Sequence, residues 1–274
     1  MTESTDALIK LYKGKNVFIF LWIFILILLS WLYIFYLGAK MTPGTMESSA
    51  YDILMPQMEK WAFNDILAAF AMWSVMMIAM MLPSAMPMIL VFSTVNRKRY
   101  SSGNQFVPTW IFLFGYLIIW VVFSLVVALI QFILHNLALV SPEIKIINPA
   151  LSGIILISAG AYQFTRIKEV CLKNCQSPLG FMMNYWREGK SGTFIMGLRH
   201  GLYCVGCCWV LMIILFAAGV MNLVWVSLIA IFIFLEKVIQ RNYVLSYISG
   251  FLLLVWGLGL IASIVIKESF ILLS

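Results

Sequence analysis

Residues 199–219 read RHGLYCVGCCWVLMIILFAAG, and this stretch decides how the rest of the chain is interpreted. Its second half is an unbroken apolar run, which predicts a membrane helix over residues 193–219. Its first half holds one of the two histidines and three of the five cysteines of the chain. On a helix these four side chains share one face, because they are spaced at i, i+4, i+7 and i+8. They are His200, Cys204, Cys207 and Cys208. Thiols and an imidazole on one stripe indicate a transition-metal site.

The composition of the whole chain is that of an integral membrane protein. Of its 274 residues, 63% are hydrophobic and 11% are charged, and the mean hydropathy is +1.00. Soluble domains are about half apolar and about a quarter charged. Little of the chain is left for a soluble domain, so we expect a multi-pass protein of the cell membrane whose helices contact the lipid bilayer and one another.

Hydropathy predicts an all-α fold, a polytopic membrane helix bundle of about seven transmembrane helices. We expect a cytoplasmic segment over 1–16, a single transmembrane domain over 17–266 and a C-terminal tail over 267–274. The first apolar run is too long for the core of a signal peptide, so we expect it to remain as a helix. The second helix contains Pro83 and Pro87, which predict a kink or an unwound turn. The seven expected helices cover residues 17–38, 64–94, 109–135, 149–165, 193–219, 223–239 and 246–266.

The net charge of +7 follows from topology rather than from a nucleic-acid partner. With the N-terminus inside and the C-terminus outside, most of the 18 Lys and Arg residues fall in the inner segments, including the clusters at 97–99 and 166–190. This is the asymmetry that the positive-inside rule describes. The sequence therefore predicts an N-in, C-out orientation and no nucleic-acid binding.

All five cysteines are expected toward the cytoplasmic side of the membrane. Cys171 and Cys175 follow the helix at 149–165, which runs antiparallel to the helix at 193–219, so the two cysteine groups can converge. A reducing compartment disfavours disulfides and favours metal binding or redox thiols. The alternative is that these cysteines only pack, because free cysteine is a common small residue in helix cores.

The depth of the stripe limits how many of its members can share one ion. His200 and Cys208 lie about 12 Å apart along a helix at 1.5 Å per residue. A single ion therefore cannot contact both. We expect either one site that uses His200, Cys204 and Cys207 or Cys208, or two sites stacked along the helix.

Two further sets of residues are candidates for supporting roles. Met76, Met80 and Met81 on the second helix carry thioethers that suit Cu(I), as a relay or outer shell, although methionine is also ordinary core filler. Glu236 follows an apolar run directly, and an ionisable group at such a position is a candidate for a functional site. We expect Glu236 either to orient His200 or to act as a proton-carrying catalytic group.

With these residues in view, the chain resembles the DUF2182 family, which is described as predicted metal-binding integral membrane proteins. The resemblance covers about residues 65–265, and its most specific run is His-Gly-x-Tyr-Cys-x-Gly-Cys-Cys-Trp over 200–209. The other matching motifs are Met72-Trp73, Ala79-Met80-Met81-Leu82-Pro83, Tyr162-Gln163, Lys168-x2-Cys171-x3-Cys175, Gly219-x-Met221-Asn222 and Glu236-Lys237. The resemblance implies a membrane fold that binds metal.

The sequence therefore supports one leading hypothesis and two alternatives. The leading hypothesis is a membrane protein that binds a soft transition metal, copper in preference to zinc or iron, for transport, delivery or metalloenzyme maturation. A metal-delivering protein or other membrane subunits are the expected partners. The alternatives are a membrane metal-dependent oxidoreductase of the monooxygenase kind and a non-catalytic subunit of a membrane complex.

Overall fold

The computed structural model describes residues 2–40, 63–103, 105–140, 144, 146–239 and 243–273. Within them the regular structure is helical, apart from an isolated bridge between Val140 and Ile146. The helices are α1 (Thr2–Lys40), α3 (Phe63–Ser101), α4 (Thr109–Asn136), α5 (Pro149–Gln163), α6 (Arg166–Gln176), α7 (Pro178–Tyr185), α8 (Gly189–Ala218), α9 (Leu223–Val238) and α10 (Tyr243–Leu273).

Five of these helices are long and apolar enough to cross a membrane. The five spans are Phe20–Ala39, Phe63–Ser101, Thr109–Asn136, Gly189–Ala218 and Tyr243–Ile264. All seven expected helices are present, but α5 and α9 have only 15 and 16 residues. Each is about 23–24 Å long at 1.5 Å per residue, shorter than a hydrocarbon core of about 30 Å. Seven full crossings therefore remain a prediction.

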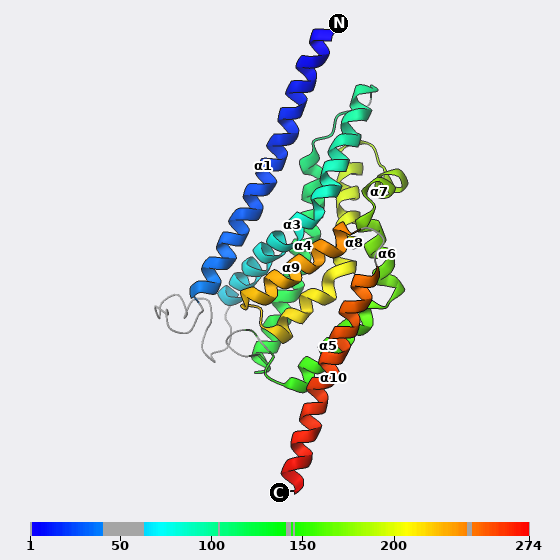
Figure 1. The fold of residues 1–274 in the computed structure, drawn as a ribbon. Coiled ribbons are helices and arrows are strands. Elements are labelled where there is room, and N and C mark those ends of the chain that lie inside the picture. Colours follow the sequence, from blue (N-terminus) through cyan, green and yellow to red (C-terminus); the bar gives the residue numbers. More distant parts are fainter. Residues whose placement is uncertain are drawn as a thin grey trace.

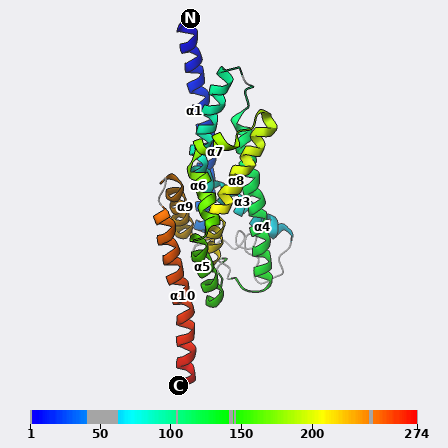
Figure 2. The same ribbon diagram turned by 90° about the vertical axis from the view of Figure 1, so that its right-hand side faces the viewer.

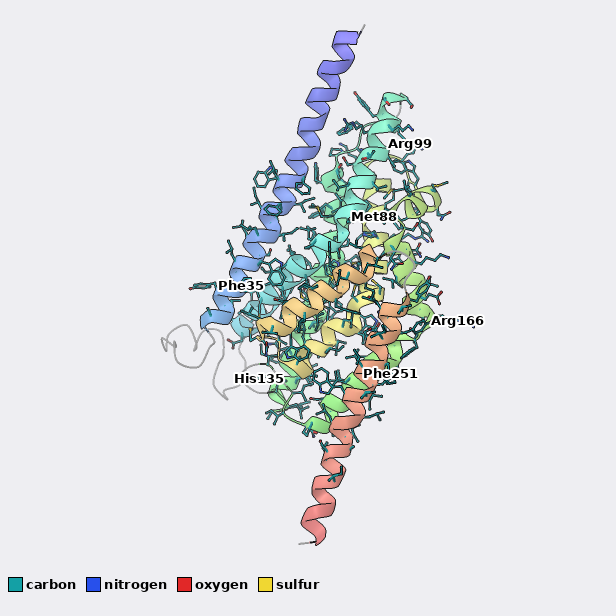
Figure 3. All side chains as sticks on the ribbon, viewed as in Figure 1. Phe35, Met88, Arg99, His135, Arg166 and Phe251 are labelled. Atoms are coloured by element: carbon teal, nitrogen blue, oxygen red, sulfur yellow. The ribbon has the colours of Figure 1, made fainter. Side chains whose placement is uncertain are left out.

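The two ends of the chain lie at opposite ends of an elongated molecule. The start of α1 and the end of α10 are far apart in both views (Figure 1 and Figure 2). Arg99 lies toward the end where α1 begins, and His135 lies toward the other end, with Met88 between them (Figure 3). This arrangement agrees with an odd number of crossings, while the side of the membrane on which each end lies stays a prediction.

The two prolines of the second expected helix bend it without unwinding it. α3 is continuous through Pro83 and Pro87, and its ribbon changes direction midway (Figure 1). The predicted unwound turn is therefore wrong. Pro83 and Pro87 lack the N–H groups that would donate to the carbonyls four residues earlier, at Ala79 and Pro83. Between these two positions, the Met81 carbonyl accepts two side-chain hydrogen bonds. Both the Ser84 hydroxyl and the Tyr116 hydroxyl donate to the Met81 carbonyl, at 2.8 and 3.2 Å.

The polar segment that follows α5 is folded into two further helices. The Thr165 side chain caps α6 by accepting from the Lys168 backbone N–H at 3.4 Å. This cap starts a new helix after the turn at Phe164, so Cys171 and Cys175 lie on α6 and not on a continuation of α5. α6 packs against α8, which brings the second cysteine group to the first.

Close packing of α4 on α8 depends on glycine. A Cβ atom added at Gly197 would lie 2.1 Å from the Phe112 carbonyl oxygen, and one added at Gly115 would lie 2.5 Å from the Phe194 carbonyl oxygen. Small residues let membrane helices approach this closely. The approach places Tyr116 of α4 beside Cys204 of α8.

Candidate metal centre

Four of the five thiols meet in one cluster between α6 and α8. The Cys207 sulfur lies 3.9 Å from the Cys175 sulfur and 3.2 Å from the Cys208 sulfur. The Cys204 sulfur interacts with the thiols of Cys175 and Cys208. The three thiols of α8 are almost fully buried. We call Cys175, Cys204, Cys207 and Cys208 the thiol cluster. The expected convergence of the two cysteine groups is thus confirmed for Cys175.

The spacing of the sulfurs suits an ion held by a pair of thiolates. At a metal–sulfur distance of about 2.3 Å, two sulfurs on one ion lie about 3.8 to 4.6 Å apart. The Cys175–Cys207 pair fits this range, and the Cys207–Cys208 pair is closer. In the described part of the chain, no three His, Cys, Asp or Glu side chains form a group that could hold a metal ion. Structural zinc takes four ligands, whereas Cu(I) accepts two thiolates.

A buried lysine supplies positive charge to the thiol cluster. The Lys237 ammonium lies 2.9 Å from the Cys204 sulfur and 3.0 Å from the Ser84 hydroxyl, and the residue is 6% exposed. The ion pairs seen among the described residues are Arg99–Glu188 and Lys168–Glu236, so no described carboxylate pairs with Lys237. A buried ammonium needs a counter-ion. The Cys204 sulfur, 2.9 Å from the Lys237 ammonium, lies at the position of that counter-ion.

The hydrogen bonds of Cys204 affect the protonation of its neighbours. The hydrogen bond with Cys204 raises the pKa of the Cys175 thiol well above its ordinary value. Cys175 is therefore a neutral thiol in the metal-free protein, beside a sulfur that faces an ammonium. The Tyr116 hydroxyl lies 3.2 Å from the Cys204 sulfur, and the Met81 sulfur lies 4.0 Å from the Lys237 ammonium. Side chains from α3, α4 and α9 thus surround the Cys204 sulfur.

Glu236 belongs to a separate polar network and shares none of the contacts of Lys237 described above. Its carboxylate accepts from the Lys168 ammonium and from the Ser246 hydroxyl, both at 2.5 Å. Lys168 also donates to Gln163, and Gln176 donates to the Glu236 backbone carbonyl at 2.7 Å. The expected contact between Glu236 and His200 is not formed. This network joins α5, α6, α9 and α10 and so holds α9 in position, while a catalytic role for Glu236 stays a prediction.

His200 is placed among aromatic rings, one helical turn from Cys204. Its ring stacks on Phe112 and Tyr116 with centroids 5.9 and 5.4 Å apart, and Phe181 meets it edge-on at 5.6 Å. Its Nδ1 atom is buried and has no hydrogen-bond partner among the described residues. His200 also interacts electrostatically with Cys204. Its role as a ligand stays a prediction.

Cys171 is the one cysteine that the structure does not join to the thiol cluster. Its sulfur packs against Gly206, where an added Cβ would lie 2.7 Å away. No contact between it and another thiol is seen in the described residues. Burial raises the pKa of the Cys171 thiol. Its role as a ligand also stays a prediction.

The three candidate methionines lie on the buried face of α3. Met76, Met80 and Met81 are at most 3% exposed. Met81 reaches the thiol cluster through Lys237. Met76 lines a cavity toward the other end of α3. The methionines therefore lie between the cluster and that cavity.

Sequence reasoning missed two residues that contact Cys204. Lys237 is the second residue after an apolar run and lies beside Glu236, and this position is a signal for a buried charge. Tyr116 carries no local signal, because its contact with Cys204 exists only after α4 packs against α8. Lys168, the partner of Glu236, was likewise counted only as a topological charge.

The apolar helices fit a lipid bilayer, and four thiols meet between α6 and α8. The family described as PpoB2, copper chaperone, matches residues 70–260, which is most of the chain, and the protein belongs to this family. No curated protein and no solved structure matches the chain. The match supports the prediction of a copper-related protein, and it does not test the resemblance to DUF2182.

Proposed function

We propose that this protein holds Cu(I) as a cargo in the thiol cluster and passes it to another protein at the membrane. The observation that carries the proposal is the buried Lys237 ammonium, 2.9 Å from the Cys204 sulfur in a cluster of four thiols, three of them buried. Soft thiolates select Cu(I) over the harder divalent ions. Membership of a family described as copper chaperones supports the same cargo.

The charge of the site favours a monovalent ion. Two thiolates and one Cu(I) carry a net charge of −1, which the Lys237 ammonium neutralises. A divalent ion on the same two thiolates would leave one uncompensated positive charge in the apolar interior, which is costly. Lys237 thus helps to distinguish Cu(I) from Zn(II) without contacting the metal.

The arrangement also allows Cu(I) to exchange between thiols. The Cys207 sulfur lies close to two other sulfurs, so Cu(I) can move from one thiol pair to another without leaving the cluster. Such exchange suits delivery better than permanent storage. The oxidoreductase and structural-subunit alternatives stay predictions.

The test is the copper content of purified variants loaded with Cu(I) under reducing conditions. We expect about one copper per chain in the wild type and a large loss in Cys204→Ser and Cys207→Ser. Cys171→Ser is the matched control, since Cys171 lies in the same region but outside the thiol cluster, and it should retain the wild-type content. Equal copper in all four proteins, or negligible copper in all four, would contradict the proposal.

A further inference from the structure

A second group of sulfur atoms lines a cavity away from the thiol cluster. The cavity is small, with a volume of about 20 Å³, and lies between α1, α3 and the turn that joins α8 to α9. Met72 and Met76 of α3 and Met221 of the turn line it, and Ile34, Leu37 and Leu223 form much of the remaining wall. Three thioethers from two separate parts of the chain therefore face one space.

The chemistry of this wall is selective. Every side chain that lines the cavity in the described residues is apolar, so the methionine sulfurs are its only side-chain donor atoms for a metal. Neutral thioethers bind soft ions such as Cu(I) and do not hold Zn(II) or Mg(II). Methionine is also common packing material that fills irregular gaps. The convergence of methionines from α3 and from the turn after α8 on one space is what favours a metal site over packing.

Buried methionines connect this cavity to the thiol cluster. Met76 and Met80 are one helical turn apart, and Met81 follows on the same helix, with all three at most 3% exposed. Met76 and Met81 are separated by about 8 Å along the helix axis. The Met81 sulfur lies 4.0 Å from the Lys237 ammonium, which contacts the Cys204 sulfur.

We propose that Met72, Met76 and Met221 form a second, weaker Cu(I) site that exchanges metal with the thiol cluster along α3. The proposal rests on the function proposed above, because it assigns the same cargo to both sites. Thioethers are neutral and leave the charge of Cu(I) uncompensated, whereas the thiolates neutralise it. Cu(I) in the cavity therefore transfers to the thiolates near Cys204, and the cavity is the site that Cu(I) occupies first.

The experiment is a titration of the purified, reduced protein with Ag(I), a soft monovalent substitute for Cu(I), in competition with a thioether chelator. We expect two classes of site in the wild type, a tight class at the thiols and a weaker class at the methionines. The triple variant Met72→Leu, Met76→Leu, Met221→Leu should lose only the weaker class. The matched control changes Met88, Met182 and Met212 to leucine, because these are buried methionines that do not line the cavity.

A measurement on the unchanged sequence covers the case in which the triple variant does not fold. Protein labelled with selenomethionine and loaded with a second equivalent of Cu(I) should show selenium neighbours in X-ray absorption at the copper edge. A weaker class that survives in the triple variant, or a tight class alone with no copper–selenium contact, would overturn the methionine site. Loss of the tight class with the weaker class retained would instead overturn the proposed function of the thiol cluster.

Discussion

Replacing Lys237 with methionine should weaken Cu(I) binding without removing a metal ligand. The Lys237 ammonium lies 2.9 Å from the Cys204 sulfur, and hydrogen bonds to charged groups contribute about 1.5–3 kcal/mol. That free energy corresponds to a loss of about 10- to 150-fold in affinity. Methionine is of similar length and apolar, so it fills the space and removes only the charge. The assay is competition for Cu(I) against a bicinchoninate indicator.

A second buried lysine provides the control for this experiment. Lys168 pairs with Glu236, and both are at most 2% exposed. Removing one partner of a buried ion pair costs about 3–5 kcal/mol, so Lys168→Met should lower the melting temperature while the folded fraction binds Cu(I) normally. Wild-type affinity in Lys237→Met, or an equal loss of affinity in both variants, would refute the role given to the Lys237 charge.

Three further changes test the surroundings of the site. Tyr116→Phe removes the hydroxyl beside Cys204, so it should lower stability by about 1 kcal/mol, measured by thermal unfolding, while the copper content stays unchanged; loss of copper would make Tyr116 a ligand. Gly197→Val places a side chain against the α4 backbone, where a Cβ would lie 2.1 Å from the Phe112 carbonyl oxygen. The yield of folded protein in size-exclusion chromatography should therefore fall sharply. A wild-type yield would contradict the packing of α4 on α8. Burial raises the pKa of the Cys171 thiol, so its thiolate forms only at higher pH. Alkylation of Cys171 by iodoacetamide at pH 8, followed by mass spectrometry, should therefore be slower than that of free cysteine and should accelerate as the pH rises. Alkylation at pH 8 as fast as that of free cysteine would contradict the raised pKa.

The long apolar helices could be predicted because hydropathy over about 20 residues is a local property. α6 and α7 could not be predicted in the same way, because they are short and α6 is polar. Thr165 is a residue type that commonly caps the start of a helix, and this signal separates α6 from α5. The bend at Pro83 was predictable, but not that Tyr116 would supply a donor to the carbonyl of Met81.

For the candidate site too, the contacts set by helical spacing could be predicted from the sequence, and those set by helix packing could not. The stripe of thiols on α8 follows from helical spacing, and its approach to Cys175 follows from antiparallel helices. The Lys237 contact and the aromatic rings around His200 do not, because both depend on how α4 and α9 pack against α8. Positively charged residues near helix ends were counted for topology, so the two buried lysines were hidden among the exposed ones.

The most direct test of the central claim is X-ray absorption at the copper edge of the wild-type protein with one equivalent of Cu(I). A thiolate pair in the thiol cluster predicts a first shell of two sulfur atoms and no imidazole, with the same spectrum in Cys171→Ser and a changed one in Cys207→Ser. A first shell that contains an imidazole nitrogen, or a spectrum that is unchanged in Cys207→Ser, would contradict it.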